Sequence, residues 1–305
     1  MWNSFTNVNT GPLLAVLDFT LSHLTVGEPP LAMIDAAAEA GFRSAGLRIA
    51  ARRHQEAFQV EVIGQPQAVR EIREHAAARG VRIASVNAFQ LYPDVGWREL
   101  APLADTVIAI GAPIVIVNSF DPDEGRVVEL LARFAEPLAQ GGVRIAVEFL
   151  PYSQLRSLPQ TLRVLDRSGA RNAGVLVDLL HLDRSGGTPA DVMALDPSRI
   201  VFAQLCDARR LGAPLPDAEL MAQARTSRLE LLDGDLPLVE FVDAMPAGIE
   251  LEYESIRADL AGRPGLERAR AARADCDRFA RAYAGRSQRP RDHAAAAGAA
   301  TAAKG

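Results

Sequence analysis

Four segments of the chain each end an apolar run with a side chain that can bind a metal ion. These side chains are Glu148 in Ala-Val-Glu-Phe-Leu, Asp178 in Leu-Val-Asp-Leu-Leu, Gln204 in Phe-Ala-Gln-Leu-Cys-Asp and Glu252 in Ile-Glu-Leu-Glu-Tyr-Glu. Carboxylates that converge raise one another's pKa values unless a cation lies between them. Oxygen ligands, with at most one nitrogen from the nearby His181, suit Mg²⁺ or Mn²⁺ better than zinc, and Co²⁺ is a workable substitute. The sequence therefore predicts one divalent metal ion at these four residues.

These side chains can meet only if their segments are strands of one parallel sheet. Short β-branched runs alternate along the chain with longer amphipathic stretches, which is typical of successive βα units. The expected strands are residues 13–21, 44–49, 82–89, 113–120, 144–150, 174–180, 200–206 and 248–253. The expected helices are residues 31–39, 66–78, 97–110, 125–139, 158–167, 189–194, 236–244 and 265–283. All four candidate ligands then lie near the carboxyl ends of strands, where parallel barrels place their active sites.

The number of repeats favours an α/β fold of the (β/α)₈ TIM barrel type over an open, doubly wound sheet. Eight strands are the barrel number, and no glycine-rich phosphate loop follows the first strand, where Asp18, Phe19 and Thr20 stand. We expect residues 1–286 to form a single barrel domain. Residues 287–305 are rich in alanine and glycine and have no periodicity, so we expect a disordered tail there.

The amino-acid composition indicates which partners and which cellular compartment to expect. The 305 residues include 33 basic and 38 acidic ones, which gives a net charge of -5 and no positive field that would attract nucleic acid. Cys206 and Cys276 are the only cysteines and suggest buried free thiols in a reducing compartment. Residues 1–12 lack a signal-peptide pattern, and no apolar run is long enough to span a membrane. We expect a cytoplasmic protein without nucleic-acid or membrane partners, and homo-oligomerisation stays open.

Other polar residues stand at strand ends in the first half of the chain. Arg48, Asn87 and Asn118 could each hydrogen-bond substrate hydroxyls, although asparagine also bonds local backbone. The positive charge of Arg48 would in addition suit an anionic ligand. We interpret His23 as an ordinary loop histidine, and the basic run Ala-Arg-Arg-His at 51–54 as a solvated loop, because it lacks the interleaved aromatic residues of a nucleic-acid platform.

The candidate segments resemble the sugar phosphate isomerase/epimerase family of xylose isomerase-like barrels, from about Leu14 to Tyr283. The resemblance is carried by Val-Glu-Phe-Leu-Pro (147–151), Val-Asp-Leu-Leu-His (177–181), Gln-Leu-Cys-Asp-Ala (204–208), Asp-Gly-Asp-Leu-Pro-Leu (233–238) and Leu-Glu-Tyr-Glu-Ser (251–255). The family includes ketose 3-epimerases, hydroxypyruvate isomerases, inosose dehydratases and 3-dehydroshikimate dehydratases. These motifs therefore indicate a family and not a substrate.

The resemblance also implies roles for individual residues. Glu148, Asp178 and Glu252 match the family's metal-binding carboxylates, and the two glutamates match the pair that removes and returns a substrate proton. His181 and Arg210 match a histidine and an arginine that contact substrate. The small partner implied is a polyhydroxylated substrate, and the catalytic pair would work from its opposite faces.

Gln204 is the position at which the chain departs from the family pattern. Many members carry a metal-binding histidine there, although one branch carries glutamine. A barrel that has lost catalysis and serves only for binding is one interpretation of this departure, and the retained Glu148 and Glu252 argue against it. A zinc-cluster endonuclease of the same fold is disfavoured, because the chain has only five histidines.

The leading functional hypothesis is a metal-dependent isomerase or epimerase of a sugar or keto-polyol. A bound ion next to a carbonyl stabilises the enediolate that forms when a proton leaves the neighbouring carbon. The alternative is a metal-dependent lyase or dehydratase on the same barrel, in which a β-hydroxyl or a glycosidic group leaves after the same proton removal. The sequence does not distinguish the two outcomes.

Overall fold

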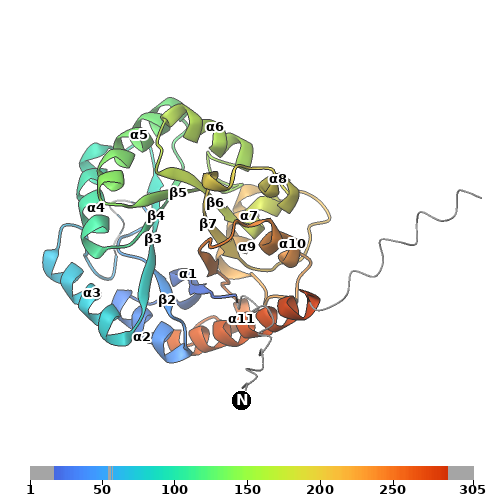
Figure 1. The fold of residues 1–305 in the computed structure, drawn as a ribbon. Helices are drawn as coiled ribbons and strands as arrows, with labels where there is room; N and C mark the ends of the chain where they lie inside the picture. Colours follow the sequence, from blue (N-terminus) through green and yellow to red (C-terminus); the bar gives the residue numbers. More distant parts are fainter. Residues whose placement is uncertain (1–16, 54–55, 57, 288–305) are drawn as a thin grey trace, which may run out of the picture.

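Strands form where the sequence carries short, continuous apolar runs. The computed structural model, which describes residues 17–53, 56 and 58–287, contains β1 (Thr20–Leu21), β2 (Ser44–Leu47), β3 (Arg82–Leu91), β4 (Ile114–Ser119), β5 (Arg144–Glu148), β6 (Ala173–Asp178), β7 (Ile200–Leu205) and β8 (Leu251–Tyr253). Each strand pairs in parallel with the next, and β8 pairs with β1, so the sheet closes (Figure 1). The predicted (β/α)₈ TIM barrel is therefore confirmed.

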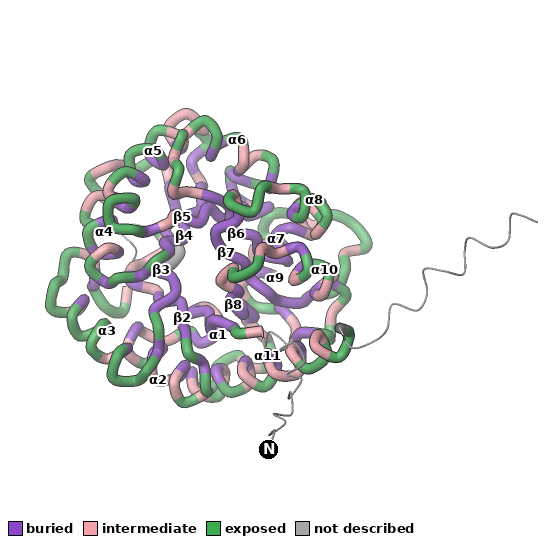
Figure 2. Tube along the Cα trace, viewed as in Figure 1, coloured by how far each residue is buried: buried purple, intermediate pink, exposed green. Residues whose placement is uncertain are grey.

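Helices form a ring around this barrel (Figure 1). They are α1 (His23–Val26), α2 (Pro30–Ala40), α3 (Pro66–Arg79), α4 (Trp97–Ile110), α5 (Glu124–Gln140), α6 (Leu158–Ser168), α7 (Leu179–Arg184), α8 (Pro189–Met193), α9 (Asp217–Thr226), α10 (Leu238–Ala244) and α11 (Gly265–Ser287), with 3-10 turns at Pro197–Arg199 and Ala258–Leu260. In α5, Val127, Leu131, Phe134 and Leu138 are buried at helical spacing. Figure 2 shows buried strands inside helices whose outer faces are exposed.

Three local differences from the sequence prediction lie near the carboxyl ends of the strands. The strand expected at 174–180 ends at Asp178, because the Asp178 carboxylate accepts a hydrogen bond from the backbone N–H of His181 and thereby begins α7. Helix α9, in the long connection after β7, was not predicted, and neither was the short helix α1 after β1. These additional helices bring side chains to the same end of the barrel as the candidate ligands.

Several other expectations concern the ends of the chain and its cysteines. Residues 13–16 of the first predicted strand, and residues 288–305 of the predicted tail, lie outside the described residues. Ser287 is the last residue of α11. Cys206 and Cys276 are both buried and free, as expected. Among the helices of the described residues, none combines the length and the apolar content that crossing a bilayer requires.

Candidate metal centre and active site

Strand register places the four predicted ligands at the carboxyl end of the barrel. Glu148 is the last residue of β5 and Asp178 is the last residue of β6. Asp178 pairs with Gln204 on β7, and Gln204 pairs with Glu252 on β8. All four side chains are buried. The structure therefore brings Asp178, Gln204 and Glu252 to one level of three neighbouring strands, with Glu148 on the strand before them.

Glu148, Asp178 and His181 form a compact group that could hold a metal ion. Each offers one ligand atom, and these atoms all lie within 4.8 Å of one another. The Glu148 Oε1 and His181 Nε2 atoms are 3.9 Å apart, and Asn118 Nδ2 donates a hydrogen bond to Glu148 Oε2 at 3.0 Å. His181, which the resemblance assigned to substrate contact, here lies with the two carboxylates. The cluster contains two carboxylates and one imidazole, a mixture that divalent ions accept.

Gln204 and Glu252 form a second pair next to this cluster. Gln204 Nε2 donates hydrogen bonds to Glu252 Oε2 at 2.7 Å and to Glu254 Oε1 at 3.0 Å. The remaining oxygens, Gln204 Oε1 and Glu252 Oε1, are buried and have no hydrogen-bond partner among the described residues. Buried acceptors normally find a donor, a water or an ion. A hard divalent cation would satisfy such orphan oxygens, and in this respect the residues present are compatible with the predicted metal, but Glu252 does not belong to the group of ligand atoms that lie within 4.8 Å of one another.

A buried arginine that the sequence analysis did not identify lies among these carboxylates. Arg228 Nη1 lies 2.7 Å from Asp178 Oδ2, and Arg228 Nη2 lies 2.9 Å from Glu254 Oε2. Its guanidinium also donates to the backbone oxygens of Glu254 and Ala224, both at 3.0 Å. One protein cation therefore compensates part of the negative charge of the carboxylate group.

Burial and mutual repulsion shift the pKa values of the site in different directions. Burial raises the pKa of Glu148 to about 8, and the carboxylates of Glu254 and Asp178 add to the rise, while the Asn118 hydrogen bond opposes it. Burial and Glu254 also hold the pKa of Glu252 well above its usual range. For Asp178 burial acts upward, but Arg228 and His181 together bring its pKa below the ordinary value. Burial lowers the pKa of His181 to about 4, which leaves a neutral imidazole that can bind a metal.

The candidate substrate-binding residues have different positions relative to the cavity at this site. Arg48 and Asn118 line it, together with Glu148, His181 and Gln204. Arg210 is exposed, its backbone N–H bonds Asp235 Oδ2 at 3.0 Å, and it does not line the cavity. The side chain of Asn87 lies outside the described part of the structure. These substrate-binding roles stay predictions.

The sequence analysis missed several residues that line the cavity, and it interpreted others differently. The cavity is also lined by His23, Arg52, Gln90, Tyr152, Arg225, Arg228 and Glu254. Strand alternation could have found Glu254, because it directly follows β8 and stands two residues after Glu252, so its side chain is expected on the same side. Glu252 itself is fully buried and does not line the cavity. Arg225, in the last turn of α9, and Arg228, just after that helix, carry no such signal, because the long connection between β7 and α10 shows no strand pattern that predicts which side chains face the cavity.

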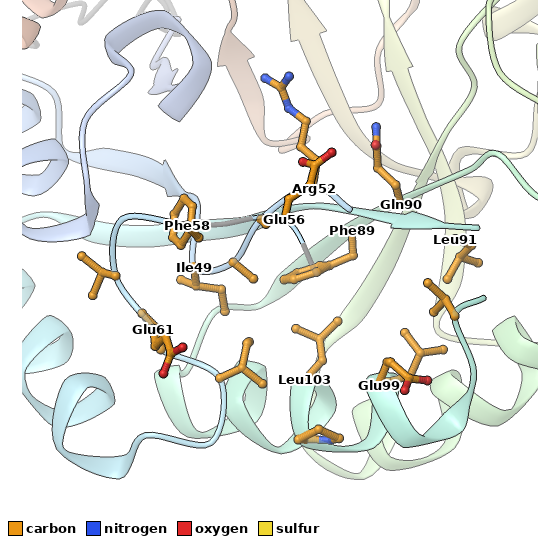
Figure 3. A pocket seen from close by; sticks show the side chains of 18 residues that line it. Ile49, Arg52, Glu56, Phe58, Glu61, Phe89, Gln90, Leu91, Glu99 and Leu103 are labelled. Carbon is orange, nitrogen blue, oxygen red and sulfur yellow. The ribbon is translucent and has the colours of Figure 1, made fainter. Parts of the chain in front are cut away.

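A larger apolar pocket lies beside the site and is separate from it. It has a volume of about 640 Å³ and lies between the loop after β2, the end of β3 and the first turns of α4. Phe89, Leu103 and Ile49 line it, and Arg52 and Gln90 lie at its edge, with the ends of their side chains directed away from Phe89 and Leu103 (Figure 3). The backbone N–H of Gln90 donates to the backbone oxygen of Arg52 at 3.1 Å, so these two residues form a wall between the two cavities.

Comparison with known proteins identifies relatives of this barrel. Residues 34–281 match the family model described as the xylose isomerase-like TIM barrel. The chain has no match among curated protein sequences.

Solved structures give the same result at the level of fold. The IolI protein with a bound zinc atom has a TM-score of 0.71 at 14% identity, over 88% of this chain and 99% of that one. D-allulose 3-epimerase from Methylomonas sp., in complex with D-allulose, has a TM-score of 0.63 at 15% identity, over 88% and 97%. The probable 3-DHS dehydratase AsbF from Bacillus anthracis has a TM-score of 0.62 at 15% identity, over 85% and 98%. At these identities the comparison shows a shared fold.

Proposed function

Because this chain belongs to the xylose isomerase-like TIM barrel family, we propose that it is a divalent-metal-dependent isomerase or epimerase of a sugar or related keto-polyol. The observation that carries the proposal is the buried group of Glu148, Asp178 and His181 at the carboxyl end of the barrel. Active sites of such barrels lie at this end. The epimerase and the zinc-bound protein among the structural relatives support this class of chemistry without naming a substrate.

The ligands we propose are Glu148, Asp178, Gln204 and Glu252, with His181 close enough to join them. This set is rich in oxygen, so Mn²⁺ or Mg²⁺ suits it best, and Co²⁺ is a reasonable substitute. When bound, the ion would supply the electrophile that stabilises negative charge next to the carbon that loses its proton.

The chain's own residues would handle the proton. Glu148 and Glu252 are the proposed pair that removes it and returns it, as the family resemblance implies. Burial raises the pKa of both carboxyl groups in the metal-free protein, and a bound cation would offset part of that rise, which leaves a carboxylate that can act as a general base. Asn118 holds one oxygen of Glu148 through its hydrogen bond, so it would orient that carboxylate toward the substrate.

A metal-dependent lyase or dehydratase is the second candidate. The observation in its favour is the probable dehydratase among the structural relatives, which has the same barrel. Removal of the same proton leads to elimination when a hydroxyl or glycosidic oxygen lies β to the carbonyl. The two functions therefore differ in the fate of the intermediate and not in the first step.

Solvent deuterium exchange tests the proposal. The purified chain with Mn²⁺ is incubated in D₂O with a panel of ketoses, inososes and 3-keto-glycosides, and products are analysed by mass spectrometry. One deuterium incorporated without loss of other mass supports an isomerase or epimerase, and loss of water or of an aglycone supports a lyase. Glu148→Gln and Glu252→Gln should each abolish exchange, whereas the exposed control Glu240→Gln should not. No exchange with any compound would count against both candidates.

Glu254→Gln is the informative companion variant, because Glu254 lines the cavity while Glu252 does not. If Glu252→Gln retains exchange and Glu254→Gln abolishes it, the base on β8 is Glu254, and our assignment of Glu252 is wrong.

A further inference from the structure

Three arginines, Arg48, Arg52 and Arg225, surround the opening of the candidate active site. Arg48 directly follows β2, Arg52 lies in the next loop, and Arg225 lies in the last turn of α9. All three line the cavity that contains Glu148 and His181. All three also line an adjoining cavity of about 360 Å³. Segments that are far apart in the sequence thus bring three positive charges to one place.

Within the described part of the chain, these arginines have no carboxylate partner in an ion pair. Within residues 17–53, 56 and 58–287, no carboxylate forms an ion pair or a side-chain hydrogen bond with any of the three guanidinium groups. Glu254 attracts Arg48 and Arg52, but its oxygens are already bound by Arg228, Gln204 and Ser22. Arg228 and a bound divalent ion would supply three positive charges against the four deep carboxylates, so at most one of the three arginines at the opening is needed to complete the balance. Glu56 also attracts Arg48, and Glu28 lines the adjoining cavity, but within the described residues neither forms an ion pair with the three arginines, so their positive charge is only partly compensated.

The pKa values of Arg48 and Arg52 also reflect burial and repulsion from neighbouring arginines. Burial lowers the pKa of Arg48 to about 10, and repulsion from Arg52 adds to the effect. Burial likewise lowers the pKa of Arg52, followed by repulsion from Arg225. Guanidinium groups stay charged at neutral pH. Such a cluster is unfavourable by itself, and an anion between its members would relieve the repulsion.

Some buried polar atoms that face the same space have no hydrogen-bond partner in the described part of the chain. His23 is 4% exposed and lines both cavities, and neither of its ring nitrogens has a hydrogen-bond partner among the described residues. The Nε atom of Arg48 is also buried without a partner there. Burial, followed by the charges of Arg48 and Arg52, keeps the pKa of His23 well below its usual value. Its neutral ring therefore offers one donor and one acceptor to a ligand.

The orientation of Arg52 supports a shared ligand. In the close view of the apolar pocket, the Arg52 side chain points away from Phe89 and Leu103 (Figure 3). Its neighbour Arg53 has a different environment, because its guanidinium lies over the ring of Tyr92 at 4.6 Å from the centroid. Arg53 lines neither the active-site cavity nor the adjoining one. Two consecutive arginines thus have different surroundings, and only one faces the site.

We propose that Arg48, Arg52 and Arg225, together with His23, form an oxyanion subsite, and that the substrate is a keto-polyol carrying a carboxylate or phosphate group. The polyol part of this inference rests on the proposed function, while the anion subsite stands on the arginines. Guanidinium groups bind planar or tetrahedral oxyanions through paired hydrogen bonds, and they suit both kinds of group. The subsite would hold the charged end of the substrate while its carbonyl end reaches the carboxylate cluster.

Isothermal titration calorimetry of the full-length protein in low-salt buffer with Mn²⁺ tests the subsite. The probes are two matched pairs: D-gluconate against the neutral D-glucitol, and D-fructose 6-phosphate against D-fructose. We expect at least one anionic probe to bind about tenfold or more tightly than its neutral partner. Arg52→Gln and Arg225→Gln should each remove most of that difference and leave the affinity of the neutral probe unchanged. The control Arg53→Gln should behave as the wild type.

The two anionic probes identify which group the subsite prefers, and preference for either one supports the proposal. Equal binding of charged and neutral probes, no measurable binding of either anion, or an equal effect of Arg52→Gln and Arg53→Gln would overturn it. Circular dichroism confirms that each variant is folded. Calorimetry needs no turnover, so a protein that binds gluconate through these arginines but catalyses no deuterium exchange would keep the subsite and lose the proposed function. A protein that catalyses deuterium exchange but does not prefer anionic probes would keep the proposed function and lose the subsite.

Discussion

The guanidinium of Arg228 and the carboxylate of Asp178 form an ion pair in which both side chains are almost wholly buried. Arg228 Nη1 and Asp178 Oδ2 are 2.7 Å apart, and the side chains are 2% and 0% exposed. The same guanidinium reaches Glu254 at 2.9 Å. The carboxylate cluster therefore contains one fixed cation from the protein. Glu148 and Glu252 have no such ion pair within the described residues, and their charge is what a metal ion would compensate.

Arg228→Gln should destabilise the metal-free protein by about 3–5 kcal/mol, because two buried carboxylates lose their cation. Adding saturating Mn²⁺ should recover part of this loss, since the ion then supplies positive charge nearby. Urea unfolding in the presence of a chelator, and again with Mn²⁺, measures both effects. Arg209→Gln, a change at an exposed arginine, is the control and should have little effect. A variant as stable as the wild type without metal would show that the ion pair contributes no net stability.

The raised pKa of Glu148 predicts how stability depends on pH in the metal-free protein. Its ordinary value of 4.5 applies to the unfolded chain, and its folded value is about 8. Between these two pH values the folded state holds a proton that the unfolded state has released. The free energy of unfolding should therefore fall as pH rises through this window, by at most about 1.4 kcal/mol per pH unit for this group.

Glu148→Gln, which is neutral at every pH, should make this slope shallower, and the exposed control Glu240→Gln should leave it unchanged. Chemical unfolding between pH 5 and pH 8 in a chelator gives the slopes. Equal slopes for the wild type and Glu148→Gln would mean that Glu148 is ionised in the folded protein at neutral pH.

Asn118→Ala should change the pH profile of catalysis and not only its rate. The hydrogen bond from Asn118 Nδ2 to Glu148 Oε2 favours the ionised carboxylate. Without it the pKa of Glu148 should rise, so the acidic midpoint of the deuterium-exchange profile should move upward by roughly one pH unit or less. Asn172→Ala is the matched control, because Asn172 bonds the backbone oxygens of Ala135 and Val143 instead. A slower reaction with an unmoved midpoint would indicate a purely structural role for Asn118.

The fold was predictable from the sequence because the local signals agree with one another. Apolar runs such as Ile114–Val117 are buried strands, and glycines such as Gly80 and Gly111 end helices with positive φ values of 66° and 78°. The ends of helices and strands were less predictable where a hydrogen bond from a side chain sets them. Leu179 and Leu180 extend the apolar run of β6 in the sequence, yet the Asp178 cap places them in a helix.

The site was predictable only where it lies on strands. The positions of Glu148, Asp178, Gln204 and Glu252 near strand ends follow from the strand pattern, and the register brings Asp178, Gln204 and Glu252 to one level, while their roles stay predictions. Arg225 and Arg228 come from the connection that holds the unpredicted helix α9, so only tertiary packing shows that they face the site. Arg52 was interpreted as part of a solvated basic loop, but the loop backbone pairs with Gln90 and turns this one side chain toward the cavity.

Asp207 should act as a positioning residue for the loop that carries Arg228. Its carboxylate accepts hydrogen bonds from the backbone N–H groups of Leu232, Gly234 and Leu236 at 2.9–3.2 Å. A Cβ on Gly234 would lie 2.1 Å from Asp207 Oδ1, so Gly234→Ala cannot fit without moving the loop. Gly234→Ala should reduce stability by about 1–3 kcal/mol and weaken Mn²⁺ binding. Gly212→Ala, which has open space, is the control. Unchanged stability in Gly234→Ala would contradict this role.

Calorimetric titration of chelator-treated protein with Mn²⁺ tests the central claim most directly. The account predicts one ion per chain in the wild type, and an affinity at least about 100-fold lower in Glu148→Gln and in Asp178→Asn, because each removes a ligand. Glu240→Gln should bind like the wild type. If the wild type takes up no stoichiometric ion, or if the two ligand variants bind Mn²⁺ as tightly as the control, the buried carboxylates are not a metal centre.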